Sequence, residues 1–254
     1  MSYNLSSTHI LGVRVDATSY TQATALICTW SKEAVSRMVC IANVHMLMTA
    51  YDDDAFRSVL QAADLVTPDG MPLVWTLRRM GYKNQGRVYG PTLTKKLLPL
   101  LAEAGLPVGF LGSTPGVIDR LQSRISQEHP QIKLVYAYSP PFRALTIQEN
   151  TDIVAAINRS GARVMFVGLG CPKQELWMHA HLGEVKAVML GVGAAFDYLA
   201  GVKPQAPLWV QRFGMEWFFR LVTEPKRLWK RYLVHNPRFV AKVTVELLRR
   251  YHSK

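Results

Sequence analysis

Apolar and polar positions alternate through residue 203 in a pattern that predicts strands and helices in turn. Short apolar runs precede longer segments in which apolar residues recur every three to four positions, the spacing of an amphipathic helix. Strand-bearing segments are expected at residues 10–17, 36–43, 64–69, 108–114, 133–142, 162–168 and 186–192. Helices are expected at residues 20–31, 45–50, 52–63, 71–80, 115–128, 146–160 and from 173 onward. This alternation predicts an α/β fold with a mainly parallel sheet and helices on both faces.

The pattern changes after residue 203. The stretch KPQAPLW is typical of a linker, and beyond it Trp and Phe alternate with Arg and Lys over helical segments that we expect to break at Pro225 and Pro237. Residues 201–254 hold 12 Lys and Arg against 3 Asp and Glu, so they carry +9 of the total net charge of +12. We therefore divide the chain into an α/β catalytic domain, residues 1–203, and a basic amphipathic helical appendage, residues 204–254.

The appendage is the part of the chain that should meet an anionic partner. Basic aromatic segments bind nucleic acid or lie on an anionic membrane surface, and some of the aromatics simply pack onto the domain. The aromatic density favours the membrane surface, because such side chains settle at the interface. We expect no nucleic-acid partner. The aromatic residues concerned are Trp209, Trp217, Phe218, Phe219, Trp229 and Tyr232.

The N-terminal residues and the cysteines indicate a cytoplasmic protein. No basic region followed by a long apolar run opens the chain, and the longest apolar stretch, residues 187–196, is too short to cross a bilayer. Cys28, Cys40 and Cys171 are odd in number and lack CxxC spacing, which is typical of reduced thiols. If the protein touches a membrane, it does so from the surface.

Candidate ligand-binding residues gather at the predicted carboxyl ends of strands, where ligands bind in parallel α/β sheets. Asp69 lies there in a Pro-Asp-Gly turn. Turn chemistry explains an Asp at this place, and so does a general base held at the mouth of a cleft. The other strand-end residues favour the second interpretation. They are Asn43, Gly112, Tyr138, Gly168 to Gln174, and Asp197.

Two glycine loops, GFLGST and FVGLGCPKQE, each join a predicted strand to a helix. Backbone N–H groups and a helix N-terminus would therefore face the cleft, although neither loop matches a dinucleotide or P-loop motif. The consecutive Lys173, Gln174 and Glu175 favour a nucleotide over an ordinary turn at the second loop. Asp197 follows the small residues GVGAA and either accepts sugar hydroxyls or caps a helix.

No metal site is expected. Asp52, Asp53 and Asp54 contain the DxD pattern, but acids between two helical segments suit a helix start. His179 and His181 are two residues apart on a predicted helix and so point to different faces.

Together the motifs resemble the WecG/TagA/CpsF glycosyltransferases, family 26. In chain order from Ile10 to Tyr232 they are VTPDGMPLVW, GRVYGPTL, VGFLGST, YSPPF, VGLGCPKQE, GVGAAFDYLAG and APLWVQRFGMEWFFRLVTEPKRLWKRYL. The resemblance implies a Rossmann-like fold and an inverting, metal-independent transfer that needs no cofactor. The sugar would move from a UDP-sugar donor, of the N-acetylmannosamine or glucose type, to a polyprenyl-diphosphate-linked sugar in cell-surface polysaccharide synthesis. It implies a peripheral location at the inner face of the cell membrane.

The resemblance also assigns roles to residues. Asp69 would be the catalytic base, and we place Asn43 with it as a second catalytic residue. Combined with the strand-end residues, it gives a UDP-sugar site of Gly112, Ser113, Tyr138, Gly168, Lys173, Gln174, Glu175 and Asp197. The lipid diphosphate would meet Arg212, Arg220, Arg227 and Arg231.

Two departures from the family pattern lie near the expected sugar site. Ile41 replaces a Thr at the end of the second strand, and Thr92 replaces an acid, so the sequence leaves the donor sugar open. A nucleotide-sensing or nucleic-acid-binding protein without transferase activity is the alternative from another class. A UDP-sugar enzyme acting on soluble sugars is a second. The sequence also leaves open whether the chain forms a homo-oligomer.

Overall fold

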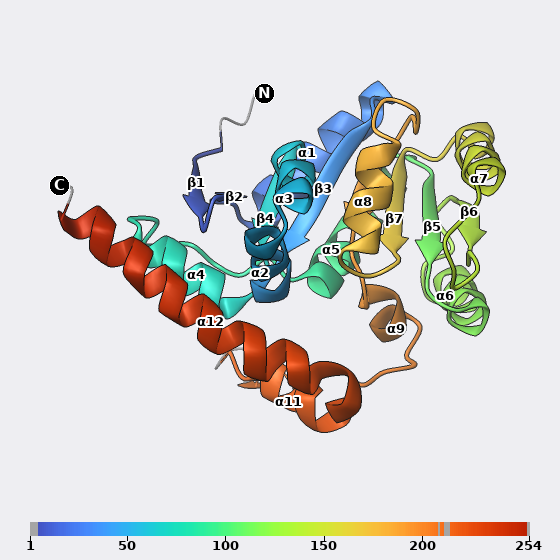
Figure 1. Cartoon of the computed structure of the whole chain (residues 1–254). Helices are drawn as coiled ribbons and strands as arrows, with labels where there is room; N and C mark the ends of the chain where they lie inside the picture. The colour runs from blue at the N-terminus through green and yellow to red at the C-terminus, as the bar shows by residue number, and fades with distance from the viewer. Residues whose placement is uncertain (1–4, 208, 211–213, 253–254) are drawn as a thin grey trace.

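A six-stranded sheet forms the centre of the computed structural model, which describes residues 5–207, 209–210 and 214–252. All of its strand pairs are parallel, in the order β4-β3-β8-β7-β5-β6 (Figure 1). The strands are β3 (Arg37–Ala42), β4 (Leu65–Pro68), β5 (Val108–Gly112), β6 (Leu134–Tyr138), β7 (Val164–Gly168) and β8 (Val188–Gly191). The α/β fold predicted from the apolar pattern is confirmed.

Alternate side chains of each strand point to opposite faces, so the sheet supports two apolar cores. Met38 and Cys40 face one core, and Val39 and Ile41 face the other. The first core is covered by α2 (Val44–Asp52), α3 (Asp54–Gln61), α7 (Ile147–Ser160) and α8 (Lys173–Ala180). The second is covered by α1 (Tyr20–Glu33), α5 (Gly90–Glu103), α6 (Pro115–Glu128) and α9 (Ala195–Leu199). Helices therefore cover both faces, as expected.

The prediction of a single strand at residues 10–17 is wrong. The chain forms an antiparallel hairpin instead, with β1 (Ser7–Ile10) and β2 (Val13–Asp16) in a separate two-stranded sheet. Leu11 and Gly12 have φ of 51° and 81°, the two left-handed positions of a tight hairpin turn. Apolar residues alternate on both sides of this turn, which hides the reversal in the sequence.

Helix α5 has no counterpart among the predicted helices, whereas α4 (Met71–Arg79) was expected. Pro91 in the first turn and Pro99 inside the helix weaken the helical signal of this segment. Leu93 and Leu97, four residues apart, are fully buried against the sheet and hold the helix in place.

Two helices follow the α/β domain, α11 (Glu216–Thr223) and α12 (Pro225–His252). Figure 1 shows them passing below the arrowheads of the sheet, with α12 running back beside α4. Helix α12 begins at Pro225 as expected, but it continues through Pro237, so the predicted break is wrong. Arg238 forms two hydrogen bonds with Asp52 at 2.7 and 2.9 Å, and these tertiary contacts oppose the cost of the proline.

Helix α12 contributes side chains to the core of the sheet. Phe239 and Val243, four residues apart, are 2% and 5% exposed and belong to the first apolar core. The domain boundary at residue 203 stays a prediction, but α12 and the sheet share this core. Among the described helices, none combines the length and apolar character that crossing a bilayer requires.

Truncation of Phe239 should destabilise the protein strongly. We expect Phe239→Ala to lower the free energy of unfolding by about 3–5 kcal/mol, because a ring buried in a packed core is removed. Val240→Ala is the matched control, since Val240 is 58% exposed and should change stability by no more than about 0.5 kcal/mol. Urea denaturation followed by circular dichroism measures both. Equal stability of the two variants would mean that α12 does not pack as described.

Candidate active site

A cleft of about 830 Å³ runs along the carboxyl ends of the central strands. Because the strands are parallel, the residues that follow them meet at one edge. The cleft is lined there by Asn43, Asp69, Ser113, Gly168 and Gly193, and across from them by Arg220, Arg227, Leu228 and His235 of α11 and α12. Of the residues predicted at strand ends, the structure places Asn43, Asp69, Gly168, Gln174 and Asp197 on the lining of this cleft.

The two glycine loops contact each other directly. A Cβ on Gly112, whose φ is 125°, would lie 2.5 Å from the carbonyl carbon of Gly168, so this contact requires glycine. Ser113 follows with φ of 61°, an uncommon conformation for a residue with a side chain, and its N–H donates to Gly168 O at 3.1 Å. Ser113 lines the cleft, and residues with strained backbone at such sites often have a functional role.

Gln174 ties the second glycine loop to the end of β8. Its Oε1 accepts hydrogen bonds from Gly170 N and Gly193 N, both at 3.1 Å, while its Nε2 donates to Glu175 Oε1 at 2.6 Å. Gln174 lines the cleft, whereas Glu175 is fully buried behind it. The structure therefore gives Gln174 a role in holding two loops, and UDP binding by these two residues stays a prediction.

Asp197 lies in the first turn of α9 and lines the cleft. Ala194 takes the N-cap position, so Asp197 is not the cap. Its carboxylate pairs with Lys203 Nζ at 2.7 Å, and Lys203 also pairs with Glu224 at 3.0 Å. An acid is thus present where a sugar hydroxyl could meet it, and it is also linked to the far end of α11.

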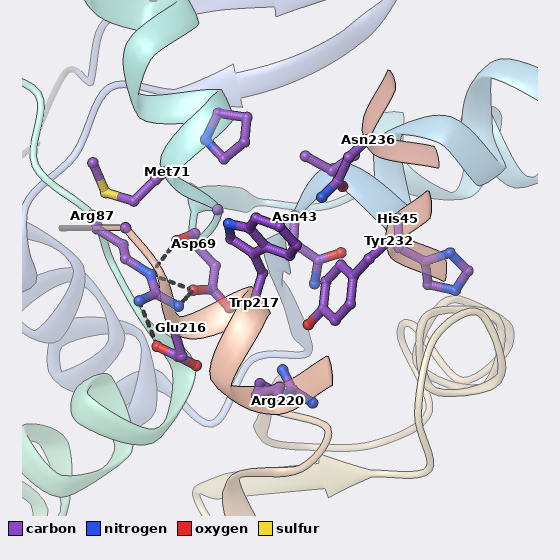
Figure 2. Close-up of a pocket in the computed structure, with 14 residues that line it drawn as sticks. Asn43, His45, Asp69, Met71, Arg87, Glu216, Trp217, Arg220, Tyr232 and Asn236 are labelled. Carbon is purple, nitrogen blue, oxygen red and sulfur yellow. Dashed lines mark hydrogen bonds and ion pairs between the residues drawn. The ribbon is translucent and has the colours of Figure 1, made fainter. Parts of the chain in front are cut away.

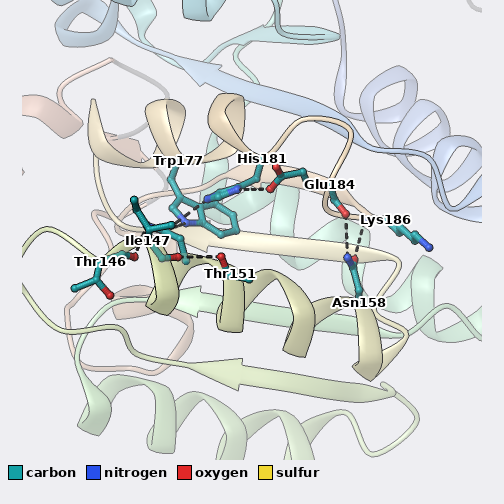
Figure 3. A network of polar contacts seen from close by, with 9 residues as sticks. Thr146, Ile147, Thr151, Asn158, Trp177, His181, Glu184 and Lys186 are labelled. Carbon is teal, nitrogen blue, oxygen red and sulfur yellow. Dashed lines mark hydrogen bonds and ion pairs between the residues drawn. The ribbon is translucent and has the colours of Figure 1, made fainter.

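Four predicted nucleotide-binding residues are absent from the described lining of the cleft: Gly112, Glu175, Tyr138 and Lys173. Tyr138 ends β6, one of the two edge strands, and is 41% exposed, and Lys173 lines a neighbouring crevice of about 500 Å³ with Phe142 and Trp177. Trp177 Nε1 donates to Asn150 Oδ1 at 3.1 Å, part of the polar network between α7 and α8 (Figure 3). Contact of Tyr138 and Lys173 with the donor stays a prediction.

Asp69 is held by contacts that ordinary turn chemistry does not require. The following Gly70 has φ of −73°, outside the left-handed region that a Pro-Asp-Gly turn can use. Asp69 Oδ1 accepts from Arg87 Nε at 2.9 Å and pairs with Arg87 Nη2 at 2.8 Å, and the same Nε donates to the main-chain oxygen of Asp69. Asp69 lines both the cleft and a smaller adjoining pocket of about 80 Å³ (Figure 2).

Arg87 lies between two carboxylates. Its Nη1 donates to Glu216 Oε2 at 2.7 Å, opposite the side that faces Asp69 (Figure 2). Its guanidinium lies 4.1 Å from the ring centre of Tyr89. Sequence reasoning missed both Arg87 and Glu216. Both lie in motifs that carry the family resemblance, but no spacing rule connects residues 129 positions apart.

Burial dominates the electrostatics of this pocket. Burial raises the pKa of the Asp69 carboxyl, Arg87 opposes that rise, and Glu216 adds to it. Burial alone would lower the pKa of Arg87, but Asp69 and Glu216 raise it above its ordinary value. Asp69 therefore binds a proton more tightly than an exposed Asp, while Arg87 stays charged.

Arg220 of α11 is a second cation, half-buried at the junction of the two cavities. Burial would lower its pKa, but Tyr232 and Tyr198 raise it, so the guanidinium stays charged. Within the part of the chain that the structure describes, its Nε has no hydrogen-bond partner. A charged, buried donor with unused capacity suits a phosphate group, which matches the planar guanidinium.

The other predicted tail arginines divide into three cases. Arg227 lines the cleft and pairs with Glu224 at 3.0 Å. Arg212 lies outside the described residues, and the side chain of Arg231 is likewise not described. Their contact with a lipid diphosphate stays a prediction.

The three consecutive acids make structural contacts. Asp52 pairs with Arg238 at 2.7 Å, Asp53 caps α3 by accepting from Ala55 N and Phe56 N, and Asp54 pairs with Arg57 at 2.7 Å. Across the described ranges, no three His, Cys, Asp or Glu side chains gather into a group that could hold a metal ion.

The fold and site define a parallel α/β protein whose carboxylate and guanidinium groups meet under its own C-terminal helices. The chain belongs to the glycosyl transferase WecG/TagA/CpsF family, whose pattern it matches over residues 8–253. It is therefore a glycosyltransferase, and the family resemblance drawn from its motifs is confirmed.

Two relatives share the name N-acetylglucosaminyldiphosphoundecaprenol N-acetyl-beta-D-mannosaminyltransferase. The protein of Bacillus subtilis (strain 168) is 32% identical over 203 residues, which cover 79% of this chain and 77% of the relative. The protein of Bacillus spizizenii is 30% identical over 217 residues, which cover 85% of this chain and 81% of the relative.

Proposed function

We propose that the protein transfers a sugar from a UDP-sugar to a polyprenyl-diphosphate-linked N-acetylglucosamine during synthesis of a cell-surface polymer. The names of the two relatives support this acceptor and an N-acetylmannosamine donor. The observation that carries the proposal is the half-buried Asp69, which lies where the large cleft meets the pocket under α11 and α12. Donor and acceptor can then approach one carboxylate from two cavities.

In the proposed reaction, an acceptor hydroxyl attacks C1 of the donor sugar from the side opposite UDP. Asp69 removes the hydroxyl proton as the new C1–O bond forms. The old C1–O bond breaks, its electron pair leaves with UDP, and the anomeric centre inverts. A carboxylate with a raised pKa is suited to this general-base role because it holds the proton more strongly in the transition state.

The departing diphosphate needs positive charge, which we assign to the chain itself. Arg220 lines the cleft as a half-buried cation, and Thr114 lines it at the N-terminus of α6. Guanidinium groups and helix N-termini both bind phosphate. In this proposal, fixed groups of the protein supply the stabilisation and transfer proceeds without a metal ion.

The lipid acceptor implies contact with the inner face of the cell membrane. Phe218, Trp229 and Leu233 of α11 and α12 are exposed, close in sequence to Lys226 and Arg227. Apolar side chains beside basic ones are typical of helices that lie in the bilayer interface. We propose that these helices bring the acceptor diphosphate to Arg220 while the chain stays peripheral.

The donor sugar depends on the floor of the cleft. Ile41 lines the cleft next to Gly90 and places a methyl-rich surface there. Thr92 lies outside the described lining and interacts with Tyr20. We propose an N-acetylhexosamine donor from the names of the relatives, with glucose as the second candidate.

Release of UDP from a panel of UDP-sugars tests the proposed function. The assay contains a synthetic prenyl-diphosphate N-acetylglucosamine acceptor and EDTA. We expect acceptor-dependent release from one donor, which also identifies the transferred sugar. Release from no donor, together with no UDP binding by calorimetry, would contradict the proposal. Membership of a glycosyltransferase family favours this reaction over the alternative of a nucleic-acid-binding protein.

A further inference from the structure

Contacts other than the one with Glu216 hold the backbone next to Arg87, the face of its guanidinium, and two of its three side-chain nitrogens. Val88 N donates to Pro68 O at 2.8 Å, which anchors the backbone next to Arg87 against the end of β4. The guanidinium lies over the ring of Tyr89, and its Nε and Nη2 contact Asp69. Only Nη1 points away from Asp69, and that nitrogen meets Glu216 (Figure 2).

Glu216 reaches Nη1 of Arg87 because a tight turn at Gly214 places the start of α11 close to α4. Gly214 has φ of 71°, and a Cβ there would lie 3.1 Å from Met71 Cγ, so the turn packs closely on α4. Glu216 follows two residues later as the first residue of α11 and is only 5% exposed. A carboxylate buried to this extent is costly unless it is paired, and Arg87 is its described ion-pair partner.

We propose that Glu216 is a positioning residue for the general base: it holds Nη1 of Arg87 and shares its positive charge, so that Arg87 orients Asp69 without neutralising it. The proposal rests on the proposed function, because the base role of Asp69 does. Without Glu216, the full charge of Arg87 would act on Asp69 alone, and Asp69 would become a weaker base. The packing of α11 over the cleft would then also set the pKa of Asp69, because α11 carries Glu216.

The electrostatic balance around Asp69 is consistent with this role. Burial raises the pKa of Asp69, Arg87 lowers it, and Glu216 raises it again. The pKa values of Tyr20 and Tyr89 are raised, chiefly by burial, so both phenols stay neutral at working pH. The groups that face Asp69 or share its pocket are Tyr20 of α1, His45 of α2, Arg87 and Tyr89 before α5, Glu216 and Arg220 of α11, and Tyr232 of α12.

The test is the titration of Asp69 itself in Glu216→Gln. Carbon-13 NMR of protein labelled at the aspartate side-chain carboxyls measures the pKa of Asp69 directly. The resonance that disappears in Asp69→Asn is assigned to Asp69. Titration of His45 is therefore not mistaken for that of Asp69. We expect the pKa of Asp69 to fall by about one unit when the like charge is removed. The acidic limb of the pH profile of kcat/KM should shift to lower pH by the same amount. The value of kcat should fall about tenfold, with little change in the KM for the donor.

Glu224→Gln is the matched control for loosening of α11. Glu224 ties the other end of this helix through Lys203 at 3.0 Å and has no described contact with Arg87. It should leave the pKa of Asp69 and the acidic limb unchanged. Equal titration of Asp69 in wild type and Glu216→Gln would overturn the proposal.

Glu216→Asp separates charge from packing. It keeps the negative charge on a shorter side chain, so the pKa of Asp69 should stay close to the wild-type value. A shift as large as that of Glu216→Gln would contradict charge sharing. If wild type transfers sugar to no acceptor, the proposed function fails, whereas the NMR titration still decides whether Glu216 controls Asp69.

Discussion

Asp69→Asn is expected to lower the rate of sugar transfer by about 10²- to 10⁴-fold, the range that general-base catalysis contributes. The asparagine oxygen can still accept from Arg87, so the pocket should keep its shape. UDP affinity should therefore change little, because the loss concerns proton removal. Single-turnover transfer with saturating donor measures the rate, and calorimetry with UDP measures the binding. Near wild-type turnover in this variant would remove Asp69 as the base.

The raised pKa of Asp69 predicts both a pH profile and a stability effect. Activity should fall as the pH drops through this raised pKa, since the protonated acid cannot accept a proton. The folded state binds this proton more tightly than the unfolded chain, so stability is lost as the pH rises through the same range. Asp69→Asn avoids that cost, and we expect it to melt no lower than wild type at neutral pH. A clearly lower melting temperature would mean that the Arg87 ion pair outweighs burial.

Arg220→Ala is expected to lower kcat/KM by about 10²-fold or more. Arg220 is a half-buried cation that lines both cavities, and removing one fixed charge from a diphosphate site costs this much in comparable catalytic sites. Arg220→Lys should recover only part of the loss, because an ammonium lacks the planar fork that fits phosphate oxygens. Steady-state kinetics with the lipid-linked acceptor measure both variants.

Arg159→Ala is the control for the loss of one positive charge. Arg159 is exposed at the end of α7 and is absent from the described linings of the three cavities. It should keep wild-type kinetics. Wild-type kcat/KM in Arg220→Ala would contradict the phosphate role and leave the guanidinium as a structural group.

Sequence reasoning found the edge of the sheet at which the site lies, for a physical reason. Each parallel strand ends on the same side, so Asn43, Asp69 and Gly168 had to meet once their strands were recognised. The common direction of the strands does not determine where a side chain points. Tyr138 ends β6, at the edge of the sheet opposite β4, and is absent from the described lining of the cleft, whereas Asp69 follows the other edge strand and lines it.

The residues that complete the site come from segments far apart in the sequence. Arg87 lies in an irregular segment between α4 and α5, and Glu216 reaches it from a helix that begins 129 residues later. Long-range contacts of this kind depend on how α11 and α12 fold back over the sheet. The same contacts explain why α12 passes through Pro237, because Phe239 and the Arg238 ion pair are tertiary effects that local propensity cannot show.

The most direct test of the proposed reaction is the anomeric configuration of its product. NMR of the disaccharide released from the lipid by mild acid gives the one-bond C1–H1 coupling constant of the new linkage, which defines this configuration for manno- and gluco-configured sugars alike. An α-linked UDP-sugar should yield a β-linked product, because Asp69 activates the acceptor for one in-line displacement of UDP. An α-linked product would require two displacements and would contradict Asp69 acting as the base of a single-step transfer.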